Sequence, residues 1–253
     1  MKNLIVLLLI IFLCACTQVE EKTLSRLESI PADAVKMTPE TDAAPPKTYS
    51  DEFLDPVPVE GINTAGAEDS VFIDGDNVYF FFTPDVDVPV EQQVTGGMTG
   101  IYVSEKTAEG WSEPEQVVLQ DKGKLSLDGC EFVRGDRIWF CSAREGYTGV
   151  HWFTAEFKDS RWQDWKKADF DDISELHMIG DEMYYHADSG KGDLDIWLMR
   201  KNSEGWSDQI NVAEVNSDRD EAWPYVTEDE LWITRDFGLW RSKWMARVLS
   251  LSL

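Results

Sequence analysis

Short hydrophobic runs recur between residues 60 and 244, and each follows a polar turn of similar composition. The runs occupy residues 78–80, 138–140, 183–185 and 231–233, after Gly-Asp-Asn, Gly-Asp-Arg, Gly-Asp-Glu and Glu-Asp-Glu. Gly-Asp beside a polar residue favours a tight hairpin turn, and β-branched and aromatic runs favour buried strands. The pattern therefore predicts four β-hairpins.

Two further features repeat in step with the hairpins. A turn precedes Trp111, Trp162 and Trp206, and apolar pairs stand at 101–102, 196–197 and 239–240. The hydrophobic runs begin 45 to 60 residues apart, which approaches the period of propeller blades. The sequence predicts an all-β fold, a β-propeller of four-stranded antiparallel blades, with about four blades and the last one incomplete.

The segments GIYVSEKTAEGWSEPEQV and DIWLMRKNSEGWSDQINVAEVNSDRDEAWP resemble the WD40-like repeats of TolB-type periplasmic β-propellers. The likeness covers about residues 60 to 244. It implies a propeller that binds a protein or small ligand, but propellers host many unrelated activities. The first repeat departs from the pattern by an insertion at 84–97, which we expect to form a loop over one rim.

The pattern fails near the carboxyl end. Leu249 stands where the repeat requires Trp, and residues 237–253 contain no Asp or Glu. We expect truncation or a changed reading frame to have removed most of a closing blade, which would leave an exposed strand edge. A natural apolar tail that completes the ring is the alternative.

The amino end resembles a bacterial lipoprotein signal. An apolar run at 4–13 is too short to span a bilayer, which takes roughly 20 residues, but it suits a secretory signal. Leu-Cys-Ala-Cys at 13–16 resembles a lipobox, which implies a signal peptide at 1–15 and lipidation of Cys16. Thr17, where an inner-membrane retention signal usually has Asp, favours the outer membrane, facing the periplasm or the outside. An ordinary cleaved signal is the alternative.

Residues 16–56 are rich in Glu, Thr, Ser, Ala and Pro and lack strand alternation. They predict a flexible tether, with a possible short helix near Ser25, ahead of a propeller domain at 57–253. The chain has 48 acidic and 23 basic residues, a formal charge of -25. Such a surface repels nucleic acid and suits cationic partners, although solubility alone also explains it.

Ligands of propellers bind at the mouth of the central channel, where the innermost strands begin. The candidate ligand-binding residues are Glu68, Asp69, Asp128, Glu175, His177 and Glu221. An acidic ring there suits a cation, a basic peptide or a sugar, and the alternative is that the acids only satisfy turn amides. The repeats that this chain resembles usually carry Ser-x-Arg and a Gly-rich loop after the second strand. The resemblance therefore implies that Arg144 and Arg235 pair with these acids and brace loops.

Two hairpins suggest further chemistry. A two-residue turn at Gly180-Asp181 places Glu175 opposite His186 and His177 opposite Tyr184, on one side of the hairpin. Two His and a carboxylate are zinc ligands, and a hydrogen-bonded cluster between blades is the alternative.

The same argument around Gly135-Asp136 places Cys130 opposite Cys141, within reach of a disulfide. Secretion permits oxidation, and two buried thiols are the alternative.

The sequence therefore favours a non-enzymatic, envelope-anchored binding or scaffold module of the TolB-like type, for a protein, small-molecule or glycan ligand. The alternative is a glycosidase-like hydrolase with Asp69, Asp128, Glu175 and Glu221 as candidate catalytic carboxylates. No phosphate-binding loop, nucleophile elbow or spaced Cys/His zinc pattern occurs, so no cofactor is indicated.

Overall fold

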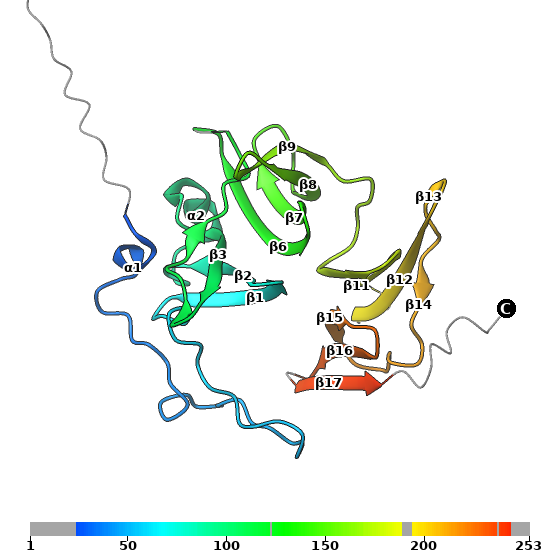
Figure 1. The fold of residues 1–253 in the computed structure, drawn as a ribbon, viewed down its shortest axis with the longest axis horizontal. Coiled ribbons are helices and arrows are strands. Elements are labelled where there is room, and N and C mark those ends of the chain that lie inside the picture. Colours follow the sequence, from blue (N-terminus) through cyan, green and yellow to red (C-terminus); the bar gives the residue numbers. More distant parts are fainter. Residues whose placement is uncertain (1–23, 122, 189–193, 237, 244–253) are drawn as a thin grey trace, which may run out of the picture.

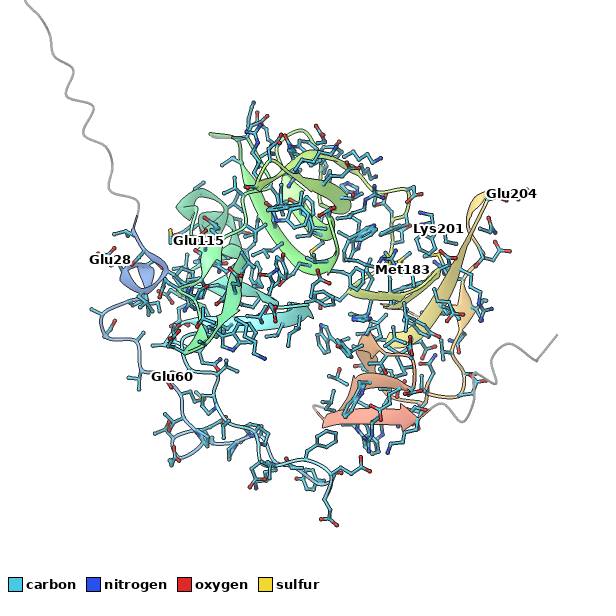
Figure 2. The ribbon with its side chains drawn as sticks, in the orientation of Figure 1. Glu28, Glu60, Glu115, Met183, Lys201 and Glu204 are labelled. Carbon is cyan, nitrogen blue, oxygen red and sulfur yellow. A yellow bond between two sulfur atoms is a disulfide. The ribbon has the colours of Figure 1, made fainter. Side chains whose placement is uncertain are left out.

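The computed structural model describes residues 24–121, 123–188, 194–236 and 238–243, and it confirms the predicted four-bladed β-propeller (Figure 1). Four antiparallel sheets stand around one axis, and side chains pack between the first and second, the second and third, and the third and fourth sheets (Figure 2). The predicted signal peptide, its Cys16 and the anomalous Leu249 lie outside the described residues.

Each sheet is a meander that runs outward from an innermost strand. The first comprises β1 (Ala67–Asp74), β2 (Asn77–Thr83), β3 (Gly100–Thr107), β4 (Gly110–Trp111) and β5 (Glu115–Gln116). The second comprises β6 (Ser126–Arg134), β7 (Arg137–Arg144), β8 (Val150–Lys158) and β9 (Arg161–Lys167).

The third comprises β10 (Leu176–Ile179), β11 (Glu182–Asp188), β12 (Leu194–Asn202), β13 (Gly205–Trp206) and β14 (Ile210–Asn211). The fourth comprises β15 (Glu221–Val226), β16 (Glu230–Arg235) and β17 (Gly238–Lys243), so the described part of the last blade has three strands.

The predicted hairpins form where the sequence places them. Gly75, Gly135 and Gly180 adopt left-handed φ values of 60°, 59° and 56° in the first three turns, a region that glycine enters without steric cost. The hydrophobic run that follows each turn lies in the second strand of its blade, and all of its residues except the half-buried Trp232 are buried. The insertion at 84–97 contains the short helix α2 (Val90–Gly96), none of whose residues is buried.

Three of the four innermost strands carry the same irregularity. A β-bulge interrupts the pairing at Ser70-Val71 in β1, at Cys130-Glu131 in β6 and at Trp223-Pro224 in β15. The first residue of each bulge has a left-handed φ of 50°, 54° and 50°, respectively. A bulge adds one unpaired residue and re-aims the side chains beside it. Simple hairpin alternation therefore holds near the turn and fails beyond the bulge.

This bulge corrects the predicted register of the cysteines. Cys141 pairs with Gly129, not with Cys130, because Cys130 lies in the bulge. Cys130 and Cys141 nevertheless form a disulfide, with their Cα atoms 5.4 Å apart. In the third blade, where no bulge is recorded, His177 pairs with Tyr184 as the turn position predicts.

Four repeat-equivalent side chains meet at the axis. Phe72, Phe132 and His177 each lie three residues before the glycine of their turn, and Tyr225 holds the matching place in the fourth blade. Ring centroids lie 4.9 Å apart between Phe72 and Phe132, 5.0 Å between Phe132 and His177, and 4.4 Å between His177 and Tyr225. These four rings, the axial plug, fill the centre of the propeller.

The amino-terminal segment contacts the first and the fourth sheets. Helix α1 (Arg26–Ser29), capped by Ser25, buries Arg26 against the first sheet. Farther along, Phe53 packs on Trp232 with ring centroids 5.6 Å apart, and Glu52 pairs with Arg241 of β17 at 2.6 Å. The segment thus runs along the side where no described strand of the fourth sheet contacts the first (Figure 1).

Neither described helix is long or apolar enough to cross a bilayer.

Candidate binding site at the propeller axis

A cavity of about 440 Å³ lies beside the axial plug, where the innermost strands of all four blades converge. We call it the axial cavity. Its wall includes Asp69 and Ser70 from β1, Glu131 from β6, Glu175 just before β10, and Trp223 from β15. A neighbouring cavity of about 540 Å³ shares Glu175 and Trp223 and extends between the second and third blades. Within the described residues, no Lys or Arg lines either cavity.

Glu131 is the most buried acid of the axial cavity. Only 6% of the residue is exposed, and neither carboxylate oxygen meets a hydrogen-bond donor of another described residue. Burial raises the pKa of Glu131 well above its usual value, and the carboxylates of Glu175 and Asp69 raise it further. A buried polar group without a partner is destabilising, so a hydrogen-bond donor placed beside Glu131 would stabilise it.

Asp69 and Glu175 share this acidic environment. Burial raises the pKa of Glu175, and the charge of Asp69 adds to that effect, while hydrogen bonds from the side chains of Trp223 and Ser70 oppose it. Partial burial likewise raises the pKa of Asp69. The Oγ of Ser70 lies 3.5 Å from Oε1 of Glu175 and links the first blade to the third.

The two candidate histidines bind the backbone of the next blade. The N–H of Val226 donates to Nδ1 of His177 at 3.3 Å, and the N–H of Trp223 donates to Nδ1 of His186 at 3.2 Å. Burial lowers the pKa of each histidine to about 4, so both are neutral at pH 7. Nε2 of His177 is buried and has no hydrogen-bond partner among the described residues.

The weak metal candidates, Glu175, His177 and His186, do not assemble into a metal site. Within the described ranges, no group of three or more His, Cys, Asp or Glu side chains could hold a metal ion. Both Nδ1 atoms are already acceptors of backbone N–H groups, which leaves them unavailable as ligands.

The other three predicted acids lie outside both cavities, because arginines bind them. Nη2 of Arg144 donates to Oδ1 of Asp128 at 2.7 Å, and Nε of Arg235 donates to Oε1 of Glu221 at 2.5 Å. This confirms the expectation that both arginines pair with acids. In the first blade, whose second strand does not end in Arg, Arg26 donates to Glu68 at 3.2 Å.

Glu68, Asp128 and Glu221 occupy one repeat position, two residues before the bulge. Each arginine also stacks on aromatic rings of its own blade. We call these three pairs the arginine-braced acids. They hold the beginnings of β6 and β15 to the ends of their hairpins, and the beginning of β1 to α1, so their charges are compensated within the chain.

The sequence therefore identified two of the three acids that line the axial cavity, Asp69 and Glu175, and missed Glu131, together with the polar Ser70 and the rim aromatic Trp223. Glu131 escaped because it stands in an apolar strand, between Cys130 and Phe132, where simple alternation does not place it at a channel mouth. Aligning the turns of the repeats would have shown that Ser70, Cys130, Glu175 and Trp223 hold one position.

Comparison with protein families, with curated proteins and with solved structures finds no match to this chain. The site therefore has to be interpreted from its own geometry.

Proposed function

We propose that this propeller is a non-enzymatic binding module of the TolB-like type, which takes a side chain of a partner protein or a small ligand into the axial cavity. The observation that carries the proposal is Glu131, which is buried in the wall of a cavity of about 440 Å³ without a hydrogen-bond donor from another described residue. A ligand that supplies the donor relieves this deficit. Trp223 and Tyr225, which are 54% and 43% exposed, add aromatic contact area at the rim.

The proposal includes a location in the cell envelope, with a lipid on Cys16 and the propeller at the outer membrane, facing the periplasm or the outside. The lipobox-like residues 13–16 after the apolar run support it. Expression of the full chain in bacteria fed a clickable palmitate analogue tests it. We expect labelling of the wild type and of Cys14→Ser and none of Cys16→Ser. Labelling that persists in Cys16→Ser would contradict the anchor.

The hydrolase alternative has less support. Asp128 and Glu221 are bound by arginines, which leaves Asp69 and Glu175 as the pair from that set in the axial cavity. The raised pKa of Glu175 suits a general acid. Aryl glycosides test this alternative: turnover by the wild type that is lost in Glu175→Gln would make the protein an enzyme and refute the proposal.

A cavity-filling variant tests binding directly. Ser70 and Trp223 hold equivalent bulge positions with the same φ of 50°, so Ser70→Trp fits the backbone and fills the cavity wall. The full chain is screened by thermal shift and calorimetry against oligosaccharides, amines and short peptides. We expect a ligand that loses at least tenfold in affinity in Ser70→Trp and is unchanged in Val118→Trp, an exposed site outside the cavity. Equal binding in both variants would overturn the proposal.

A further inference from the structure

The axial cavity gathers three carboxyl groups without a described Lys or Arg beside them. Asp69, Glu131 and Glu175 come from three different blades, and the pKa of each is raised. No described Lys or Arg lines the cavity, although 23 basic residues are present in the chain. The side chains that stabilise the ionised form of Glu175 are neutral hydrogen-bond donors, Ser70 and Trp223.

Resting on the binding function proposed above, we propose that the axial cavity binds an organic cation, an ammonium or guanidinium group on an apolar stem, between Asp69, Glu131 and Glu175. The cation donates to the carboxylate oxygens, and the stem lies against Trp223 and Tyr225 at the rim. An ammonium offers three donors and a guanidinium five, and neither group accepts hydrogen bonds, so both match a wall of acceptors.

The molecule itself contains the template for this recognition. Arg144 places its guanidinium 2.7 Å from Asp128 and at 4.6 Å and 4.4 Å from the ring centres of Phe153 and Trp165. Arg26 similarly meets Glu68 and lies 5.4 Å from the ring centre of Phe80. A carboxylate beside aromatic faces is thus filled by an internal cation at these places.

The axial cavity also combines a carboxyl group with aromatic rings, but no described Lys or Arg occupies it. Glu131, buried and unpartnered, supplies the carboxylate, and the rings of Trp223 and Tyr225 supply the aromatic faces. A charge-assisted hydrogen bond is roughly twice as strong as a neutral one, so a cation answers the deficit of Glu131 better than a neutral donor. The expected occupant therefore comes from outside the described chain.

The dimensions favour an organic cation over a metal ion. A volume of about 440 Å³ far exceeds that of a bare ion, and the three carboxylates are not arranged to share one within the described residues. The exposed aromatic rim also provides no oxygen or nitrogen ligand for a metal ion, whereas its rings can pack against an alkyl stem and a delocalised or soft cation.

The proposed organic cation could belong to a free amine or to a basic side chain of a peptide. Calorimetry of the full chain at pH 7.5 and low salt distinguishes them with two probes, cadaverine and the peptide acetyl-Gly-Gly-Lys-Gly-Gly-amide. The same peptide with acetylated lysine is the neutral control, since acetylation removes the charge and keeps the stem. Binding of cadaverine alone assigns a free amine, and stronger binding of the peptide assigns a protein partner. Either result supports the proposal.

Variants locate the cation. We expect Glu131→Gln and Glu175→Gln to weaken binding of the preferred cation at least tenfold. The matched control is Glu145→Gln, a carboxylate on the exposed surface that pairs with Lys124 and lines neither cavity. Its affinity should be unchanged. Thermal melting verifies that each variant folds.

Three outcomes would overturn the proposal: no binding of either cation, equal binding of acetylated and free lysine peptides, or full affinity in Glu131→Gln. The broader function is judged separately. If a neutral oligosaccharide binds the wild type and is excluded by Ser70→Trp, the binding module stands while the cation proposal fails. If no probe of any class depends on the cavity, both fail.

Discussion

Two groups of carboxylates lie at or near the beginning of the innermost strands, and they differ in whether a cation of the chain binds them. The arginine-braced acids, Glu68, Asp128 and Glu221, occupy one repeat position, and each has an internal cation. The acids of the axial cavity, Asp69, Glu131 and Glu175, occupy three different repeat positions and have none among the described residues. The acid–arginine pair recurs in three blades and serves the fold, whereas each cavity acid occurs once and is available for a ligand.

The source of the cation differs even among the braced acids. Arg144 and Arg235 end the second strand of their own blades, but Arg26 reaches Glu68 from helix α1. The side chains of Arg26 and Glu68 are only 1% and 4% exposed, and Arg26 also donates to the carbonyls of Ile62 and Gly61. The segment predicted as a tether therefore completes the first blade with the residue that the blade lacks.

The largest expected effect comes from breaking a braced acid. Arg144→Met leaves the buried Asp128 without its cation and with hydrogen bonds only from the hydroxyls of Ser142 and Ser126. Breaking a buried pair in this way typically costs about 3 to 5 kcal/mol. Urea unfolding measures the loss. Adding Asp128→Asn to the same chain should restore part of it, because the uncompensated charge is then gone. A loss below about 1 kcal/mol would mean that the pair does not brace the blade.

Acid should destabilise the fold through His177 of the axial plug and through His186. The folded pKa of His177 and of His186 is about 4, below the ordinary value of 6.5, so their contribution is complete above pH 6.5 and is lost as pH falls toward 4. Each histidine accounts for up to about 3 kcal/mol of the free energy of unfolding over that window.

His177→Phe isolates this effect, because Phe72 and Phe132 hold the equivalent positions. The variant should be about 1 kcal/mol less stable at pH 7, since the Val226 N–H loses its acceptor. At pH 4.5 it should be the more stable protein. Urea curves at both values decide the point, and parallel losses in variant and wild type would contradict the assignment.

Removing the cation of the first blade should act more locally. Arg26→Met should cost about 2 kcal/mol, because Glu68 loses its cation but keeps hydrogen bonds from the N–H and the hydroxyl of Thr64. We also expect faster proteolysis within residues 31–56, with Lys106→Met, an exposed position of β3 outside that segment, as the control. Unchanged cleavage would show that Arg26 does not hold the segment.

The smallest expected effect comes from the cavity acids. Because the folded pKa of Glu131 is raised, its ionised form opposes folding at neutral pH and no longer does so below the ordinary glutamate value. Glu131→Gln should therefore raise the free energy of unfolding by about 1 kcal/mol at pH 7, and the gain should vanish near pH 4. Destabilisation at pH 7 would place Glu131 among the structural acids.

The resemblance to a repeat family implied the bracing by Arg144 and Arg235. Local patterns in the sequence determined the hairpins, the blade repeat and the pairing of His177 with Tyr184. These features follow from turn chemistry and strand alternation, which act over a few residues. Only the tertiary structure showed the bulges at Ser70, Cys130 and Trp223 and the ion pair of Arg26 with Glu68. It alone also brought Asp69, Glu131 and Glu175 to one cavity. These features depend on how separate sheets pack around one axis, which the spacing of neighbouring residues in the sequence does not determine.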